Sequence, residues 1–336
     1  MFRFLFAVTL AAGLPLAVAA AEARERFKFV ALGCMPYGAE NYPAYERLLA
    51  EISRQRPAFT VHCGDTKGGS EPPSEAFLVQ VRRWFDSIEG PVIYTPGDNE
   101  WTDVHRGNNG GEDPLVWLGR IRRLYFAAET SLGRAPIPLV TQRRDPIYAK
   151  FVENARWSQG GVVFATVHVV GSNNNLQPAV PGAVEEFRER DAANVAWVRA
   201  AFAEARVANA VGVALFFQAE PFFAWAAANR AGRESGFTNF LTAVEEEARA
   251  YKKPVLLVHA DEHRYRLEPK VQFPGRNEPL ENVTRLETFG AGDIHAVQVV
   301  VDPASPQVFL AGPLLVPANA LPVLPRPKAP TTAKKK

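Results

Sequence analysis

The feature that most constrains the fold is a series of apolar segments that each end in a short polar cluster. Residues 92–94 read Val-Ile-Tyr, and a Pro-Gly break then leads into Asp98, Asn99 and Glu100. An apolar, β-branched run that stops at such a turn is typical of a buried strand in an α/β sheet. Ligands bind where the carboxyl ends of such strands meet. The pattern therefore predicts a polar site at one edge of a sheet.

Strand-like and helix-like segments alternate along most of the chain, as they do around parallel sheets. The expected strands of the first hundred residues are 26–33, 58–65 and 91–98, separated by amphipathic helices at 42–55 and 74–88. Further helices are expected at 114–126, 184–207 and 240–253, and a Gly160-Gly161 turn joins two more strands. From Arg264 onward, four short segments predict an antiparallel meander.

Composition narrows the class of protein. The chain has 336 residues, of which 47% are hydrophobic, enough for one large domain with a substantial core or two small ones. The net charge of +2 comes largely from three lysines at the C-terminus. Such a balance gives no general field that attracts nucleic acid, so a nucleic-acid partner is not expected.

The two ends of the chain predict targeting and a tail. Arg3 precedes an apolar run that Pro15 interrupts and that ends in small residues near Ala23. This pattern favours a signal peptide over residues 1–23, and hence a periplasmic or secreted protein with no membrane span after cleavage; an uncleaved anchor is the alternative. Residues 24–318 are expected to form a single domain, and the Pro-rich, basic residues 319–336 a flexible tail.

Polar residues follow four of the expected strands: Asp65; Asp98 with Asn99; Gln218; and the group His259, Asp261 and His263. Strands of one sheet bring their carboxyl ends to a common rim, so these residues are expected to converge. Carboxylate, amide and imidazole groups together suit divalent metal ions, and a bridging carboxylate can hold two of them. Any one of these loops alone reads as ordinary turn chemistry. Four in one domain predict a metal site, because unpaired carboxylates at buried strand ends are costly.

The order of these motifs resembles that of the calcineurin-like metallophosphoesterases, the superfamily that includes the purple acid phosphatases. The resemblance extends from Phe27 to about Leu310. It implies an α/β fold, a four-layer sandwich of two mixed β-sheets flanked by helices, with metals at the strand ends. It also implies hydrolysis of a small-molecule phosphate ester by metal-activated water. The implied cofactors are one or two divalent ions among Mn, Mg, Fe, Zn and Ca.

The resemblance assigns roles to individual residues. Asp65, in "HCGDTKGG", matches the family's bridging carboxylate. In "PGDNEW", Asp98 stands where the family has a metal-binding Asn, Asn99 stands where it has the His that assists the leaving group, and Glu100 matches.

The remaining motifs depart further from the family pattern. Gln218 takes the place of a lone His ligand, and Cys34 takes the place of the first metal-binding Asp. Asp261 replaces the first His of the last motif, whereas His263 keeps the second.

These substitutions imply two unequal metal positions. One would be an all-oxygen shell of Asp65, Asp98, Gln218 and Asp261, which favours Mg, Mn or Ca. The other would have Asp65, His263 and Cys34, too few ligands unless water or phosphate completes the shell.

With Asn99 in the position of the catalytic His, the proton for the leaving group would come from His259, from His105 or from solvent. His105 and Arg106 lie in a polar, Gly-rich loop and are the expected phosphate contacts, since Arg offers a planar fork to phosphate oxygens.

Several alternatives stay open from the sequence. Cys34 and Cys63 are the two cysteines, and a disulfide between them, plain burial and metal ligation by Cys34 are all compatible with their positions. A second functional hypothesis is a catalytically inactive protein of this fold that binds a metal or another ligand. A dinucleotide-binding oxidoreductase is disfavoured, because "ALGCMPYG" lacks the required glycine spacing.

Overall fold

The structure is a computed structural model that describes residues 25–320. The expected signal peptide, and all but two residues of the expected tail, lie outside this range. The strands are β1 Phe27–Leu32, β2 Thr60–His62, β3 Val92–Tyr94, β4 Val140–Thr141, β5 Ala155–Gln159, β6 Val162–Thr166, β7 Gly212–Phe216, β8 Val255–His259, β9 Arg266–Val271, β10 Leu280–Glu287, β11 Ala296–Val301 and β12 Phe309–Leu314. The helices are α1 Tyr42–Gln55, α2 Glu75–Ser87, α3 Pro114–Tyr125, α4 Gly171–Asn174, α5 Ala183–Val207, α6 Pro221–Arg230 and α7 Thr238–Tyr251. Short 3-10 turns occupy Ala39–Asn41, Thr102–His105, Gly107–Asn109, Gln142–Arg144 and Pro317–Asn319.

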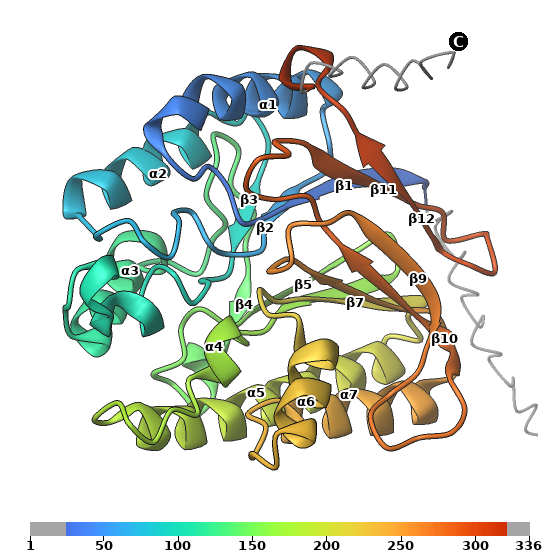
Figure 1. The fold of residues 1–336 in the computed structure, drawn as a ribbon. Helices are drawn as coiled ribbons and strands as arrows, with labels where there is room; N and C mark the ends of the chain where they lie inside the picture. Colours follow the sequence, from blue (N-terminus) through green and yellow to red (C-terminus); the bar gives the residue numbers. More distant parts are fainter. Residues whose placement is uncertain (1–24, 321–336) are drawn as a thin grey trace, which may run out of the picture.

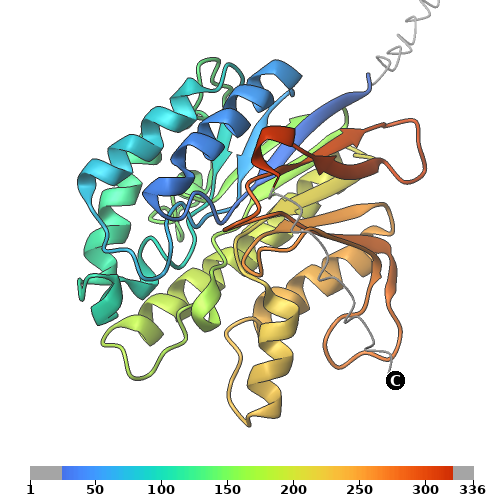
Figure 2. The same ribbon diagram turned by 45° about the horizontal axis from the view of Figure 1, so that its top comes forward.

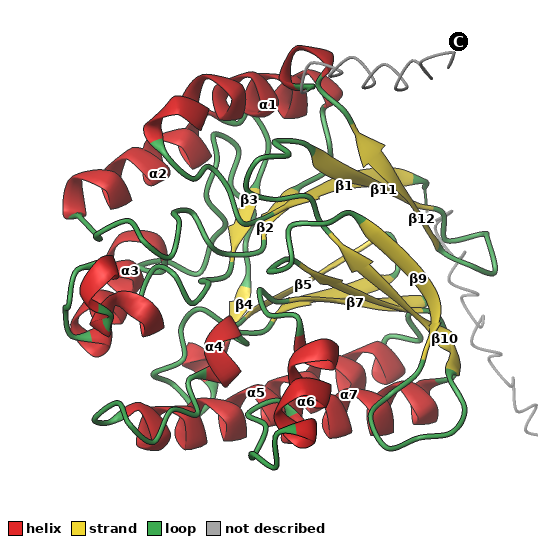
Figure 3. Ribbon diagram, viewed as in Figure 1, coloured by secondary structure: helices red, strands yellow, loops and turns green. Residues whose placement is uncertain are grey.

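Two mixed sheets form the centre of the fold. The first has the order β12-β11-β1-β2-β3, and the second has the order β4-β5-β6-β7-β8-β10-β9. Figure 1 shows α1 and α2 over the first sheet and α5 and α7 under the second, and Figure 3 shows the same layers by element type. The expected four-layer sandwich of two mixed sheets flanked by helices is therefore confirmed.

Aromatic side chains join the two sheets across their shared interface. Phe29 of β1 stacks on Phe59 at a ring distance of 5.0 Å and meets Phe216 of β7 edge-on at 5.6 Å. A second core lies between the larger sheet and helices α5 and α7. Strands β7 and β8 are therefore buried on both faces, which is why their sequences are almost continuously apolar.

The expected meander after Arg264 is wrong in one respect. Its four strands form two antiparallel pairs, but β9 and β10 belong to the seven-stranded sheet, whereas β11 and β12 belong to the five-stranded sheet. β10 also pairs with β8 in parallel, and β11 pairs with β1. Apolar alternation identifies a strand but not the sheet that it joins, because both sheets offer apolar faces.

Helix α6 begins at a side-chain cap supplied by Glu220. The Glu220 carboxylate accepts hydrogen bonds from the backbone N–H of Phe223 (2.6 Å) and Ala224 (3.4 Å), as an N-cap residue does. Pro221 occupies the first turn, where proline is tolerated. Only Pro221 and Ala228 of this helix are buried, and Figure 2 shows it (gold) projecting at the lower edge of the molecule.

No helix within residues 25–320 combines the length and the apolar character needed to span a membrane. The predicted hairpin around Gly160-Gly161 is confirmed, since β5 and β6 pair antiparallel on either side of it. Helices α1, α5 and α7 lie within two residues of their predicted bounds.

Glu287, at the end of β10, predicts a pH dependence of stability. Its buried carboxylate has no hydrogen-bond partner among the described residues, and burial raises its pKa from 4.5 to about 7. The folded protein therefore keeps a proton that the unfolded chain releases between these values, so stability falls as pH rises through this window. Urea unfolding at about pH 5 and about pH 8 should show this fall, and Glu287→Gln should flatten it. An unchanged pH dependence in the variant would contradict the assignment.

Candidate functional site

Three aspartates gather where strands of both sheets end. Asp65 follows β2, Asp98 follows β3 and Asp261 follows β8, and each offers a carboxylate oxygen within 4.8 Å of the others. Asp65 and Asp98 are buried, with exposures of 2% and 7%, and Asp261 is half-buried. We call these three residues the aspartate cluster. Its position agrees with the strand-end argument made from the sequence.

The backbone around the cluster explains the Pro-Gly break before Asp98. A Cβ atom at Gly97 would collide with Oδ1 of Asp65. The loop after β3 can therefore pass this close to Asp65 only because residue 97 is glycine. Asp65 itself has φ 57 and Asp261 has φ 87, both in the left-handed region that Asp tolerates better than most residues. These turns aim the carboxylates at one another.

Gln218, which follows β7, lies at the centre of the cluster. Its Nε2 is 3.1 Å from Oδ2 of Asp65 and 3.1 Å from Oδ1 of Asp98, and it is 3.0 Å from Oδ1 of Asp261. Its Oε1 accepts a hydrogen bond of 2.6 Å from the backbone N–H of Gly171. Because this N–H needs an acceptor, the amide nitrogen must face the carboxylates. The orientation does not support the predicted role of Gln218 as an oxygen ligand.

Cys34 and Cys63 are both free, buried thiols, so the structure contains no disulfide between them. The Cys34 thiol donates to Oδ2 of Asp65 at 3.5 Å and accepts from the backbone N–H of Asp261 at 3.2 Å. Burial, followed by the carboxylates of Asp65 and Asp261, raises its pKa well above the usual value. A protonated thiol is a poor metal ligand, so this environment does not favour ligation by Cys34.

His263 lies beside the cluster rather than in it. Its Nε2 is 3.4 Å from the hydroxyl of Tyr37, and burial lowers its pKa. Among the described residues, neither His263 nor Cys34 joins the three aspartates in a common ligand group. The second of the two expected metal positions is therefore not assembled in this arrangement.

Tyr37 and Asn99, both half-buried, are hydrogen-bond donors to Asp65. The Tyr37 hydroxyl donates to Oδ2 of Asp65 (3.1 Å), and Nδ2 of Asn99 lies 3.1 Å from the same oxygen and 3.2 Å from the Tyr37 hydroxyl. The backbone N–H of Asn99 donates to the other oxygen at 3.1 Å. Sequence reasoning missed Tyr37, although it belongs to the loop after β1 and so follows a strand end like the others.

A left-handed turn of residues 172–175 contacts Asp98 through Ser172. Residues 172–175 have φ values of 51, 55, 53 and 62, and the Ser172 hydroxyl lies 2.8 Å from Oδ2 of Asp98 and 2.9 Å from Oδ2 of Asp103. Arg106 donates to the Ser172 oxygen at 2.9 Å and forms an ion pair with Asp103 at 2.6 Å. Arg106, a predicted phosphate contact, thus anchors the edge of the site.

The two other histidines predicted for the site, His259 and His105, differ in their burial. His259 is fully buried, stacks on Phe217 at a ring distance of 5.5 Å, and belongs to the helix-facing side of the larger sheet. Burial and the nearby Arg285 charge lower its pKa to about 3. The catalytic role predicted for His259 is not supported by this position. His105 is half-buried, and its Nδ1 donates to the Thr102 carbonyl at 2.7 Å.

The aspartate cluster fits one oxygen-preferring divalent cation. No salt bridge joins its carboxylates to a lysine or arginine among residues 25–320. Burial, then the neighbouring carboxylates, raise the pKa of Asp65 and Asp261 well above the usual value. Three carboxylate donors without a salt-bridge partner suit Mg, Mn or Ca. The Gln218 amide nitrogen would have to move away from the carboxylates for such an ion to bind.

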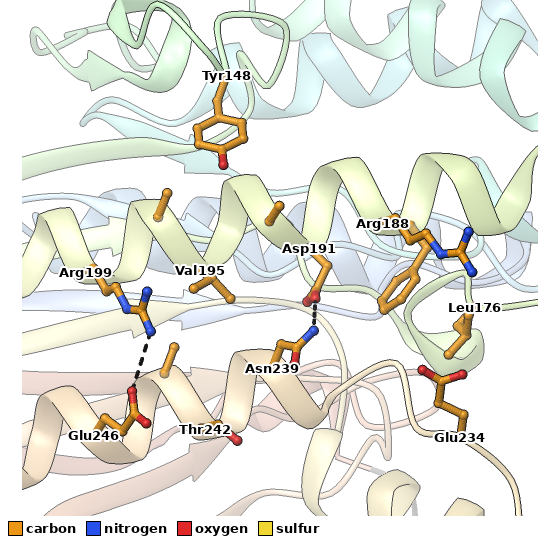
Figure 4. A pocket seen from close by; sticks show the side chains of 14 residues that line it. Tyr148, Leu176, Arg188, Asp191, Val195, Arg199, Glu234, Asn239, Thr242 and Glu246 are labelled. Carbon is orange, nitrogen blue, oxygen red and sulfur yellow. Dashed lines mark hydrogen bonds and ion pairs between the residues drawn. The ribbon is translucent and has the colours of Figure 1, made fainter.

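A separate cavity of about 610 Å³ lies between α5 and α7 (Figure 4). Asn239 of α7 donates to Asp191 of α5 at 2.7 Å, and Arg199 lies 3.5 Å from Glu246. None of the residues lining this cavity belongs to the aspartate cluster or to the site residues expected from the sequence. The cavity is therefore distinct from the candidate metal centre.

No protein-family model matches the chain, and no curated protein matches it in sequence. Among solved structures, GAP50, the anchor in the inner membrane complex of Plasmodium, aligns at 10% identity and a TM-score of 0.46, over 86% of this chain and 88% of that one. PhoD aligns at 12% identity and a TM-score of 0.47, over 83% of this chain and 64% of the PhoD chain. The purple acid phosphatase PPD1 of yellow lupin aligns at 10% identity and a TM-score of 0.46, over 90% of this chain and 57% of the lupin chain. These likenesses are of fold, at values too low to transfer an activity.

Proposed function

We propose that the protein is a hydrolase of small-molecule phosphate esters that depends on one divalent cation held by Asp65, Asp98 and Asp261. The observation that carries this proposal is the convergence of three carboxylates, two buried and one half-buried, from separate strands, with no salt bridge to any of them among residues 25–320. Burying like charges together is costly unless a cation or protons compensate. The order of the sequence motifs supports phosphate ester as the substrate class.

The roles of the surrounding residues follow from their hydrogen-bonding capacity. A bound divalent ion supplies Lewis-acid chemistry, because it neutralises phosphate charge and lowers the pKa of water. Asn99 and Tyr37 hydrogen-bond to Asp65 and to each other, and their amide N–H and hydroxyl groups would suit phosphate oxygens once a cation binds Asp65. Ser172 holds Asp98 in place through a 2.8 Å hydrogen bond. Gln218 keeps the three carboxylates together when no ion is bound.

A second candidate is a catalytically inactive protein of the same fold that binds a cation or another ligand. Two observations favour it: the Gln218 amide nitrogen occupies the centre of the cluster, and no second metal position is assembled among the described residues. Two-metal sites gain their clamp on the attacking and leaving oxygens from the second ion. A single ion would give slower hydrolysis, or none.

Removal of metal distinguishes these candidates. The full chain, treated with EDTA and assayed with p-nitrophenyl phosphate and with bis(p-nitrophenyl) phosphate, should lose its turnover and regain it with Mn²⁺ or Mg²⁺. Turnover that survives chelation would contradict the proposed function. Cation binding without any turnover would instead establish the inactive binding protein.

We further propose that the protein is exported to a periplasm or secreted, on the basis of residues 1–23 alone. Fractionation of cells that express the full chain, with N-terminal sequencing of the mature protein, tests this proposal. An intact N-terminus on protein in the membrane fraction would indicate the uncleaved anchor.

A further inference from the structure

A groove of about 800 Å³ runs along α6 next to the aspartate cluster. Most of its lining is apolar, and the apolar part consists chiefly of Ala224, Ala227 and Ala228 of α6 and of Pro178, Ala179 and Val180. Small-molecule sites have this character: mostly apolar walls with a few placed polar groups.

The groove adjoins the candidate metal centre at Ser172, and no residue of the aspartate cluster lines it. Ser172 lines the groove, and its hydroxyl is bonded to Asp98 of the aspartate cluster at 2.8 Å. His105 lines the groove as well, next in sequence to Arg106, which donates to Ser172. The groove is therefore polar at His105, Ser172 and Asn173, apolar along the alanines of α6, and polar again at Arg233 and Glu234 beyond that helix.

This polarity matches one kind of substrate. We propose that the groove binds the organic group of the phosphate ester and that this group is an apolar aryl or alkyl chain; the inference rests on the proposed function. The phosphoryl group would lie at the aspartate cluster, beside Asn99 and Tyr37, and the apolar group would extend past Ser172 along the alanines of α6. Longer side chains at Ala224 or Ala227 would occupy this space, whereas alanine leaves it open.

The test compares two esters in a groove variant and a matched control. Ala227→Arg places a long charged side chain in the groove at an exposed helix position, and Arg is nearly as good a helix former as Ala. It should lower kcat/KM for 1-naphthyl phosphate by about tenfold or more and leave kcat/KM for ethyl phosphate nearly unchanged. Asn229→Arg adds the same charge to an exposed position of the same helix outside the groove, and should change neither value.

A binding measurement separates the groove from the chemistry. Calorimetric titration of the cation-loaded protein with 1-naphthylmethylphosphonate, which cannot be hydrolysed at its P–C bond, should show binding that Ala227→Arg weakens and Asn229→Arg does not. If this holds while no ester is turned over, the groove assignment stands and the proposed hydrolysis fails. Equal effects of Ala227→Arg on both esters, or no phosphonate binding by the wild type, would overturn the groove assignment.

Discussion

Asp65→Asn is expected to weaken binding of Mn²⁺ at least about 100-fold and to lower ester hydrolysis by a similar factor. Asp65 is the member of the cluster with the most partners: the side chains of Cys34, Tyr37, Asn99 and Gln218 all approach its Oδ2. An amide in its place removes one negative charge and one ligand oxygen while keeping the shape of the side chain. Asparagine also tolerates the φ of 57 at this position.

Isothermal titration with Mn²⁺ measures the affinity, and circular dichroism confirms that the variant is folded. Asp86→Asn is the matched control, because Asp86 lies on α2, away from the cluster, in a partly exposed ion pair with Arg82, a kind of pair that contributes little. It should bind the cation as the wild type does. Wild-type affinity in Asp65→Asn would contradict the assignment of the cluster as a cation site.

The second large effect is expected from Arg190→Met, which should destabilise the fold by about 3–5 kcal/mol. Arg190 is fully buried and makes five hydrogen bonds: two to Glu186, one to the carbonyl of His168, and two to Asn174. Methionine fills similar space but leaves the buried carbonyls of His168 and Asn174 without these donors. Urea unfolding measures the loss.

Arg190 also supports the candidate site. Its bonds to Asn174 fix the left-handed turn of residues 172–175, in which each non-glycine residue costs roughly 1–2 kcal/mol relative to right-handed backbone. That turn places Ser172 on Asp98, so cation affinity should fall together with stability. Arg188→Met, at an exposed position of the same helix, is the control. Equal stability of the two variants would show that the buried network does not hold the turn.

The layered fold was expected from the family resemblance, whereas the aspartate cluster was predictable because its signals are local. Each of Asp65, Asp98 and Asp261 follows an apolar run and a turn, and parallel strands carry such ends to a shared rim. The sequence also predicted that Cys34 lies close to Asp65, since both follow neighbouring strands of one sheet.

The parts that were not predictable depend on contacts between distant residues. The orientation of the Gln218 amide is decided by the backbone N–H of Gly171, and this contact follows from the left-handed turn after β6. The burial of His259 depends on which face of β8 it occupies, and helix α6 depends on capping by Glu220. Periodicity in the sequence carries none of these details.

The most direct test of the cation site is diffraction from crystals of the full chain soaked in Mn²⁺, with anomalous scattering recorded for manganese. We expect one manganese per chain, bound by carboxylate oxygens of Asp65, Asp98 and Asp261, with the Gln218 amide moved out of the centre. A difference map without manganese at these carboxylates, with Gln218 still bonded to all three, would contradict the account.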